Sequence, residues 1–383
     1  MSSLDHFAAE KLSSLEARQL RRRLAETERE DGIMVTRDGK RLLSFSCNDY
    51  LNLSQHPDVK AAAIAAIRRF GAGAGASRLV TGNHPLYAEL EARLAKLKGT
   101  QAACVFGSGY LANAGIIPAL IGKDDLVLLD GLSHACLWAG AQLSRANLLV
   151  YRHNDLAHAE ALLEEHRLRH ERALVATDGV FSMDGDLAPL PELADLAKRY
   201  DAWLLADDAH GLGVVGGGRG AAFAFGGKIE VPLQMGTLSK AAGGYGGYLC
   251  ASRDVVDLVK NRARSFVYST GLPPASVAGA IAALDIIARG GALVEAPLRK
   301  ARAFTAAAGL DEAQSPIVPV VLGDTARALE AAQMLERAGF LAVAIRPPSV
   351  PEGTARLRLT FTAAHPDEAI VRFAALVRGI VLR

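Results

Sequence analysis

The sequence is poor in cysteine and carries almost no net charge. Its 383 residues include four widely spaced cysteines without a C-x-x-C pair, which argues against a disulfide framework or a zinc cage. The 43 basic and 41 acidic residues give a net charge of +2, so nothing indicates a broad basic surface for nucleic acid or membrane. We predict no metal, no nucleic acid and no membrane partner, and a reducing, cytoplasmic setting.

Long uninterrupted apolar runs are also scarce. The first 30 residues are charged throughout and do not resemble a secretory signal; they have the pattern of an amphipathic helix. Residues 99–122 carry no formal charge, but five glycines, Asn113 and Pro118 interrupt them. A membrane-spanning helix needs ~20 predominantly apolar residues. Because half of the chain is hydrophobic, it can instead bury large cores, which excludes general disorder.

Apolar strands and helical patterns alternate along the middle of the chain. The expected strands cover residues 101–106, 125–130, 147–152, 172–177, 202–207, 231–238 and 246–252. This alternation predicts an α/β fold with a large, mostly parallel seven-stranded sheet and helices on both faces. Ligands of such sheets bind beyond the carboxyl ends of the strands.

The pattern changes after about residue 285, where helices surround three further expected strands at 317–323, 341–347 and 355–362. A helix from residue 366 closes the chain. We therefore predict an N-terminal helix and extended segment at 1–50, a large domain at 51–285 and a smaller α+β domain at 286–383.

Two of the expected strands end in residues suited to chemistry. The strand at 202–207 runs into Asp207, Asp208 and His210, and the strand at 231–238 precedes Lys240 in a glycine-rich loop. Each segment alone has an ordinary alternative, a solvated loop or a surface lysine. Together, an acid and a lysine above one sheet edge are the pair that pyridoxal phosphate needs, for its pyridine nitrogen and its Schiff base.

Other strand ends offer a phosphate cradle and a ring partner. Backbone N–H groups at a helix start suit a dianionic phosphate, and hydroxyls can add donors. The residues of this kind are Ser108, Gly109, Tyr110, Thr237 and Ser239. His134 follows the strand at 125–130 and can stack on a pyridine ring, although a lone histidine is more often structural. The sequence thus predicts a pyridoxal-phosphate site.

Eight segments of the chain together resemble the α-oxoamine synthase family of fold-type I, pyridoxal-phosphate-dependent transferases. They are FSCNDYLNLS, FGSGYLANAG, LSHACLWAG, TDGVFSMDGD, DDAHGLGVVG, GTLSKAAGG, VYSTGLPP and IRPPSVPEGTARLRLTFTAAH. The resemblance extends from about residue 20 to 365 and is greatest to the branch of the family that works in biotin synthesis.

The resemblance implies roles for the residues in these segments. Lys240 is expected to hold the cofactor and remove the substrate's α-proton, Asp207 to pair with the pyridine nitrogen, and His210 with the phenolic oxygen. His134 is expected to stack on the ring and help the acyl step. Further cofactor contacts are expected from Ser108, Gly109, Tyr110, Ser182, Thr237 and Ser239. In a homodimer with shared sites, Ser269 and Thr270 would approach the partner subunit's phosphate.

The resemblance also implies the reaction, a decarboxylative condensation of L-alanine with pimeloyl-CoA or a pimeloyl-carrier protein. Arg358 is expected to bind the amino acid's carboxylate through its bidentate guanidinium, and Arg21 the distal carboxylate of the pimeloyl group. The alternatives are a solvent-facing strand, on which Arg356 and Arg358 share a face, and a solvated helix face for Arg21. The remaining expected substrate contacts are Asn48, His134 and Ser349.

Other functions remain open as alternatives. They are a synthase that joins glycine to acetyl-, succinyl- or fatty acyl-CoA, an aminotransferase or lyase on the same fold, and a cofactor-binding regulatory module. Ser349, Asp178 and Asn52 stand where threonine, glutamate and glycine are common in the family. None of these changes removes a group that the reaction requires, but they leave the fine substrate contacts open.

Overall fold

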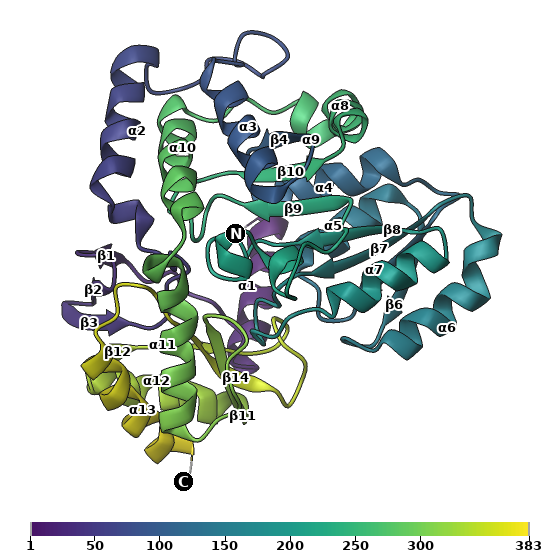
Figure 1. Ribbon diagram of the computed structural model, residues 1–383. Helices are drawn as coiled ribbons and strands as arrows, with labels where there is room; N and C mark the ends of the chain where they lie inside the picture. The colour runs from purple at the N-terminus through teal and green to yellow at the C-terminus, as the bar shows by residue number, and fades with distance from the viewer. Residues whose placement is uncertain (1, 382–383) are drawn as a thin grey trace.

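The computed structural model describes residues 2–381, which form three sheets and the helices around them (Figure 1). The largest sheet has seven strands in the order β4-β10-β9-β8-β7-β5-β6. Only β10 runs antiparallel to its neighbours, and the other adjacent pairs are parallel. The strands are β4 (Ala102–Phe106), β5 (Leu126–Asp130), β6 (Asn147–Tyr151), β7 (Ala173–Asp178), β8 (Trp203–Asp207), β9 (Leu233–Thr237) and β10 (Gly247–Ala251). The predicted fold class is confirmed.

Helices cover both faces of this sheet, so its strands are apolar on both sides. In β7, Ala173 and Val175 face one core, while Leu174 and Ala176 face the other. The first core is covered by α3 (Leu86–Lys98), α6 (Leu156–His166), α7 (Leu190–Arg199) and α10 (Pro274–Arg289). The second is covered by α4 (Gly109–Leu120), α5 (Ala135–Ser144), α8 (Arg253–Arg262) and α9 (Arg264–Val267). Each fully buried leucine contributes about 1.5–3 kcal/mol to folding.

The N-terminal helix is shorter than expected. α1 (Ser3–Ala17) begins with a capping box at Ser2 and ends well before residue 30, so the prediction of a helix over the first 30 residues is wrong. The helix has no buried residue, and Gln19 just after it takes a left-handed conformation. Its large apolar side chains, Leu4, Phe7 and Leu12, are exposed, so packing does not extend this helix. By contrast, α2 (Pro57–Phe70) begins at Pro57 and packs along α10.

Two smaller sheets bring the ends of the chain together (Figure 1). One has the order β11-β14-β13, and the other, β1-β2-β3-β12, joins N-terminal strands to a C-terminal one. Their strands are β1 (Thr27–Arg29), β2 (Met34–Arg37), β3 (Lys40–Ser44), β11 (Ile317–Gly323), β12 (Phe340–Leu341), β13 (Val343–Ile345) and β14 (Ala355–Thr360). The neighbouring helices are α11 (Ala292–Ala308), α12 (Thr325–Arg337) and α13 (Asp367–Val381). The division into three parts stays a prediction.

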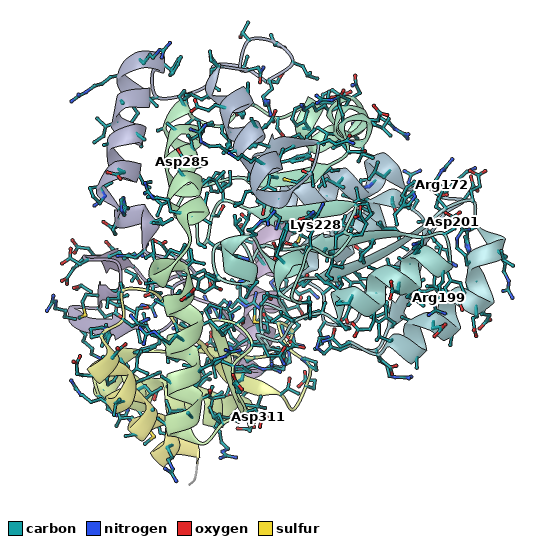
Figure 2. The ribbon with its side chains drawn as sticks, in the orientation of Figure 1. Arg172, Arg199, Asp201, Lys228, Asp285 and Asp311 are labelled. Carbon is teal, nitrogen blue, oxygen red and sulfur yellow. The ribbon has the colours of Figure 1, made fainter. Side chains whose placement is uncertain are left out.

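Charged side chains of both signs lie next to one another on the outer surface (Figure 2). Arg172, Arg199 and Asp201 lie near the ends of α6 and α7, where Arg172 pairs with Glu171 and Arg199 with Glu160. Between residues 2 and 381, no single helix has the length and apolar composition to cross a bilayer. α10 and α11 would have them together, but the chain bends by 76° between them.

Candidate active site

A cavity of about 220 Å³ lies beyond the carboxyl ends of β8 and β9. It gathers residues from distant parts of the chain because the carboxyl ends of parallel strands meet at one edge. The predicted residues that line it are Gly109, Tyr110, His134, Asp207, His210, Thr237, Ser239 and Lys240. The structure therefore brings the acid, the lysine and the helix start of α4 into one enclosure.

Lys240 and the buried His210 form a hydrogen-bonded pair at this cavity. The Nζ of Lys240 lies 2.7 Å from Nε2 of His210, and Nδ1 of His210 lies 2.7 Å from the hydroxyl of Tyr50. Burial disfavours the ammonium and lowers the pKa of Lys240 to about 8. Burial and the nearby Lys240 also hold the pKa of His210 well below its usual range. A neutral His210 accepts a hydrogen bond from Lys240 and donates one to Tyr50.

Asp207 ends β8 and is held by donors on several sides. The side-chain amide of Asn113 donates to its Oδ2 at 2.7 Å, and the backbone N–H of Ala209 donates to its Oδ1 at 3.0 Å. The thiol of Cys136 lies 3.6 Å from the same Oδ2. Asp207 is buried but lines the cavity, so this carboxylate and the amine of Lys240 face one space. This pair suits a protonated pyridine nitrogen and a Schiff base, and the donor set fits pyridoxal phosphate.

The phosphate end of such a cofactor fits the start of α4. Gly109 and Tyr110 begin the helix and line the cavity, and the first N–H groups of a helix have no acceptor within it. Ser108 caps the helix by accepting from the N–H of Leu111 at 3.2 Å. Gly109 also lies against Thr237, because a Cβ at this position would be 3.4 Å from the side chain of Thr237.

Thr237 and Ser239 shape the loop that carries Lys240. The hydroxyl of Thr237 donates to the carbonyl of Gly246 at 2.7 Å and accepts from the N–H of Ser239 at 3.2 Å. The hydroxyl of Ser239 accepts from the N–H of Gly246 at 3.2 Å. These bonds fix the turn between β9 and β10. Phosphate contacts from the two hydroxyls stay a prediction.

His134 lies at the junction of two cavities. It caps α5, its backbone N–H donates to Asp178 at 3.2 Å, and burial lowers the pKa of its imidazole. A second cavity of about 610 Å³ shares this residue and is also lined by Trp138, Ser182 and the segment 347–352. The smaller cavity can therefore hold a reacting centre while the larger one holds a longer substrate.

Of the two arginines expected to bind substrate, one is buried and the other is exposed. Arg358 is buried on β14, where its Nε donates to the carbonyl of Ser182 and its Nη1 to Asn48 at 3.1 Å. The solvent-facing alternative is wrong, because β14 is the central strand of its sheet and all its residues are buried. Arg21 pairs with Glu16 at 3.3 Å, and it is Arg22 that contacts Ser349, at 2.8 Å. A substrate contact for Arg21 stays a prediction.

Ser269 and Thr270 lie outside this cavity, on the segment that follows α9. Thr270 is exposed and bridges Ser77. Sequence reasoning gave no role to four residues that line or support the cavity: Tyr50, Asn113, Cys136 and Asp178. A signal existed for Asn113, because it lies four residues after Gly109 on the same face of a helix.

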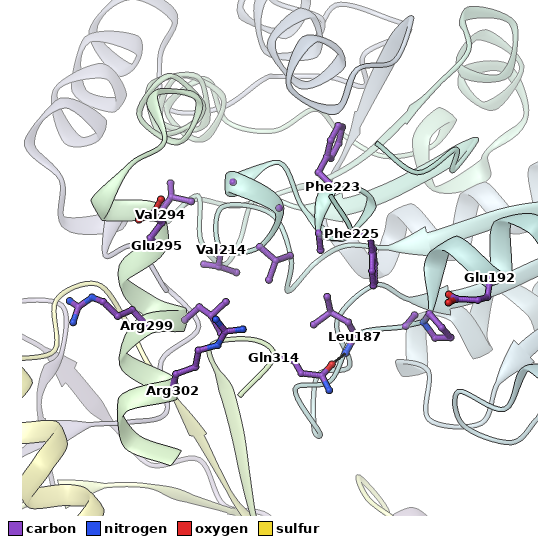
Figure 3. Close-up of a pocket in the computed structure, with 17 residues that line it drawn as sticks. Leu187, Glu192, Val214, Phe223, Phe225, Val294, Glu295, Arg299, Arg302 and Gln314 are labelled. Carbon is purple, nitrogen blue, oxygen red and sulfur yellow. Dashed lines mark hydrogen bonds between the residues drawn. The ribbon is translucent and has the colours of Figure 1, made fainter. Parts of the chain in front are cut away.

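A larger cavity lies elsewhere. It lies between α11 and the loops around Val214 and Phe225, with Arg299 and Arg302 on the helix side (Figure 3). Its volume is about 890 Å³. It contains none of the predicted site residues. The candidate active site is therefore the smaller cavity around Lys240, where the predicted site residues meet.

Comparisons with known proteins agree with this geometry. The family model for aminotransferase class I and II matches residues 40–377. An 8-amino-7-oxononanoate synthase of Beijerinckia indica subsp. indica is 63% identical over 381 residues, which cover 100% of this chain and 99% of that protein. That of Methylocella silvestris is 65% identical over 347 residues, 91% of this chain and 99% of that protein. A Sphingomonas wittichii serine palmitoyltransferase structure has a TM-score of 0.92 at 30% identity, covering 99% of this chain and 97% of that one.

The family match covers most of the chain, and the similarity to the synthases extends over nearly all of it. The resemblance seen in the sequence motifs is confirmed. The chain belongs to the aminotransferase class I and II family and, within it, to the 8-amino-7-oxononanoate synthases.

Proposed function

We propose that the chain is a pyridoxal-phosphate-dependent acyltransferase of biotin biosynthesis. It condenses L-alanine with pimeloyl-CoA or a pimeloyl-carrier protein to 8-amino-7-oxononanoate, carbon dioxide and free thiol. The observation that carries this proposal is that Lys240 and Asp207 line one cavity of about 220 Å³. The bound cofactor supplies an electron sink for the substrate's α-carbon.

The residues around the cavity divide the work of the reaction. Lys240 removes and returns the α-proton. Because its pKa is lowered to about 8, a substantial fraction of its amine is neutral near neutral pH and can accept a proton. His210 accepts a hydrogen bond from Lys240 and orients it. Asp207, held by Asn113 and Ala209, lines the same cavity, where its carboxylate would pair with the cofactor's pyridine nitrogen.

The acyl thioester occupies the neighbouring cavity of about 610 Å³. His134 lies in the walls of both cavities, so its imidazole can donate to the thioester oxygen as charge develops there. Ser349 lies in the wall of the larger cavity and accepts a hydrogen bond from Arg22. Closure of the segment 347–352 over the bound thioester would exclude water from the reacting centre.

Mass spectrometry of the product tests the proposal directly. L-Alanine and pimeloyl-CoA are expected to give 8-amino-7-oxononanoate only when both substrates and the cofactor-loaded protein are present. A panel of glycine with acetyl-, succinyl- and fatty acyl-CoA is the comparison. Faster turnover of any glycine pair than of the alanine pair would contradict the substrate assignment.

Arg358→Ala should raise the KM for L-alanine by about 100-fold, because a buried guanidinium that binds a carboxylate through two hydrogen bonds contributes several kcal/mol. The KM for pimeloyl-CoA should change by less than about threefold, because Arg358 is expected to contact only the amino acid substrate. Steady-state kinetics with each substrate varied in turn measures both values. Arg327→Ala, on the exposed surface of α12, is the matched control. Equal increases in both KM values would refute the carboxylate role.

A homodimer in the cytoplasm completes the proposal. Several large apolar side chains are exposed: Leu79, Val80, Tyr110, Tyr245 and Tyr268. A bridge between Ser77 and Thr270 brings the segment of Leu79 and Val80 next to that of Tyr268. A partner subunit on this surface would cover the exposed side chains and bring Ser269 and Thr270 to a neighbouring site. All four cysteines are free thiols, as a reducing compartment favours.

A further inference from the structure

A histidine between two carboxylates lies outside the active-site cavity, just after β6. The Nδ1 of His153 is 3.0 Å from Asp130 and its Nε2 is 2.9 Å from Asp186. Both ring nitrogens therefore face oxygen acceptors, and only the protonated imidazolium can donate to both. Burial opposes the charge, but the hydrogen bonds to the two carboxylates outweigh it and raise the pKa of His153 to about 10.

One of the two carboxylates is fixed to the large sheet. Asp130 ends β5 and is fully buried. Its Oδ1 also accepts from the N–H of Leu132 and its Oδ2 from the N–H of Asn154, both at 2.8 Å. The carboxylate of Asp130 is therefore held rigidly, and His153, bonded to it, fixes the position of Asp186.

Asp186 closes a tight turn at residues 181–186. The N–H of Phe181 donates to the carbonyl of Asp186 at 3.0 Å, and the N–H of Gly185 donates to the carbonyl of Phe181 at 2.9 Å. Gly185 has a φ of +78°, and a side chain there would meet the carbonyl oxygen of Ile317 at 2.1 Å. The ring of Phe181 packs edge-to-face against His153 with centroids 4.3 Å apart. His153 thus contacts both ends of the turn.

The opposite side of the same turn binds the two arginines of β14. The carbonyl of Ser182 accepts from Nε of Arg358. The carbonyl of Met183 accepts from Nη1 of Arg356 at 3.3 Å, and Asp184 pairs with the same nitrogen. A continuous set of contacts therefore runs from Asp130 through His153 and the turn to the guanidinium of Arg358.

We propose that His153 is a positioning residue for the amino acid substrate: held between Asp130 and Asp186, its imidazolium fixes the turn at 181–186 and, through it, the guanidinium of Arg358. The inference rests on the proposed function, because it takes Arg358 as the group that binds the substrate's carboxylate. Lys240 and Asp207 have partners of their own at the cavity. Loss of the contacts between His153 and the two aspartates, which we call the clamp, should therefore weaken amino acid binding more than cofactor attachment.

His153→Gln and Asp186→Asn, singly and together, test this in the cofactor-loaded protein. Glutamine cannot donate to two carboxylates on opposite sides, and asparagine keeps the shape of Asp186 without its charge. The visible absorbance of the cofactor is titrated with L-alanine, and both KM values are measured. Each single variant should raise the half-saturating alanine concentration by about tenfold, and the double variant should raise it no further, because the residues act through one contact. Cofactor absorbance and the KM for pimeloyl-CoA should stay within about twofold.

The control is His170→Gln, a histidine that bonds the carbonyl of His166 at 2.9 Å, away from the turn. If the unmodified protein shows no response to L-alanine, the proposed function fails and takes this inference with it. If it responds and His153→Gln has the same half-saturating concentration, the inference alone fails. Multiplying effects in the double variant, or a joint loss of cofactor absorbance and of both substrates' binding, would also overturn it. Asp186→Asn, the milder change, decides the matter if His153→Gln does not fold.

Discussion

Lys240→Ala is expected to lower turnover by at least about 10³-fold and to abolish the protein-bound absorbance of the cofactor. Alanine removes both the amine that attaches the cofactor and the base that moves the α-proton. His210, the basic side chain beside it, cannot replace it, because an imidazole cannot form a Schiff base and its low pKa makes it a weak base. The measurements are a visible absorption spectrum and the rate of product formation from L-alanine and pimeloyl-CoA.

Lys228→Ala is the matched control for this variant. Lys228 is exposed, and its Nζ donates to the carbonyl of Gly99 at 2.8 Å, on a loop outside the cavity (Figure 2). Its loss should leave both the spectrum and the turnover unchanged. A visible spectrum in Lys240→Ala that matches that of the unmodified protein would refute the assignment of the attachment residue.

The large sheet was predictable because its strands are buried on both faces. A strand such as β8 (Trp203–Asp207) must be apolar along nearly its whole length, and the polar residues that end it mark the sheet edge. The same reasoning joins Asp207 to Lys240, since both follow strands whose carboxyl ends share that edge. Strand composition therefore carries information about the site as well as about the fold.

Contacts between the large sheet and the C-terminal part were not predictable in this way. Tyr50 and Arg358 reach the site from the N-terminal segment and from β14, and no local pattern records that these segments meet. The choice between Arg21 and Arg22 has the same origin, since neighbouring arginines on an exposed segment differ only in what lies beside them. The clamp at His153 is also tertiary, because its two acids come from separate loops.

Asp207→Asn should lower kcat by about 10²–10³-fold while lowering the thermal stability less than the loss of a buried ion pair does. Asparagine keeps the size of the side chain and its acceptor for the N–H of Ala209, but it lacks the negative charge that keeps a pyridine nitrogen protonated. Stopped-flow or steady-state turnover with saturating substrates measures kcat, and a thermal unfolding curve measures Tm. A kcat within about threefold of that of the unmodified protein would show that the negative charge of Asp207 is not needed for the reaction.

The neighbouring acid supplies the matched comparison. Asp208 is equally buried, but it pairs with the buried Lys98 at 2.5 Å and accepts from the N–H of Ala221 at 2.9 Å, and it does not line the cavity. Breaking a buried ion pair costs about 3–5 kcal/mol, so Asp208→Asn should lower the Tm while the folded fraction keeps its kcat. The two neighbouring aspartates would then differ in effect: the change at Asp207 would lower mainly kcat, and the change at Asp208 mainly Tm. If Asp208→Asn instead lowered kcat as much as Asp207→Asn, the charge of Asp207 would have no special place in the reaction.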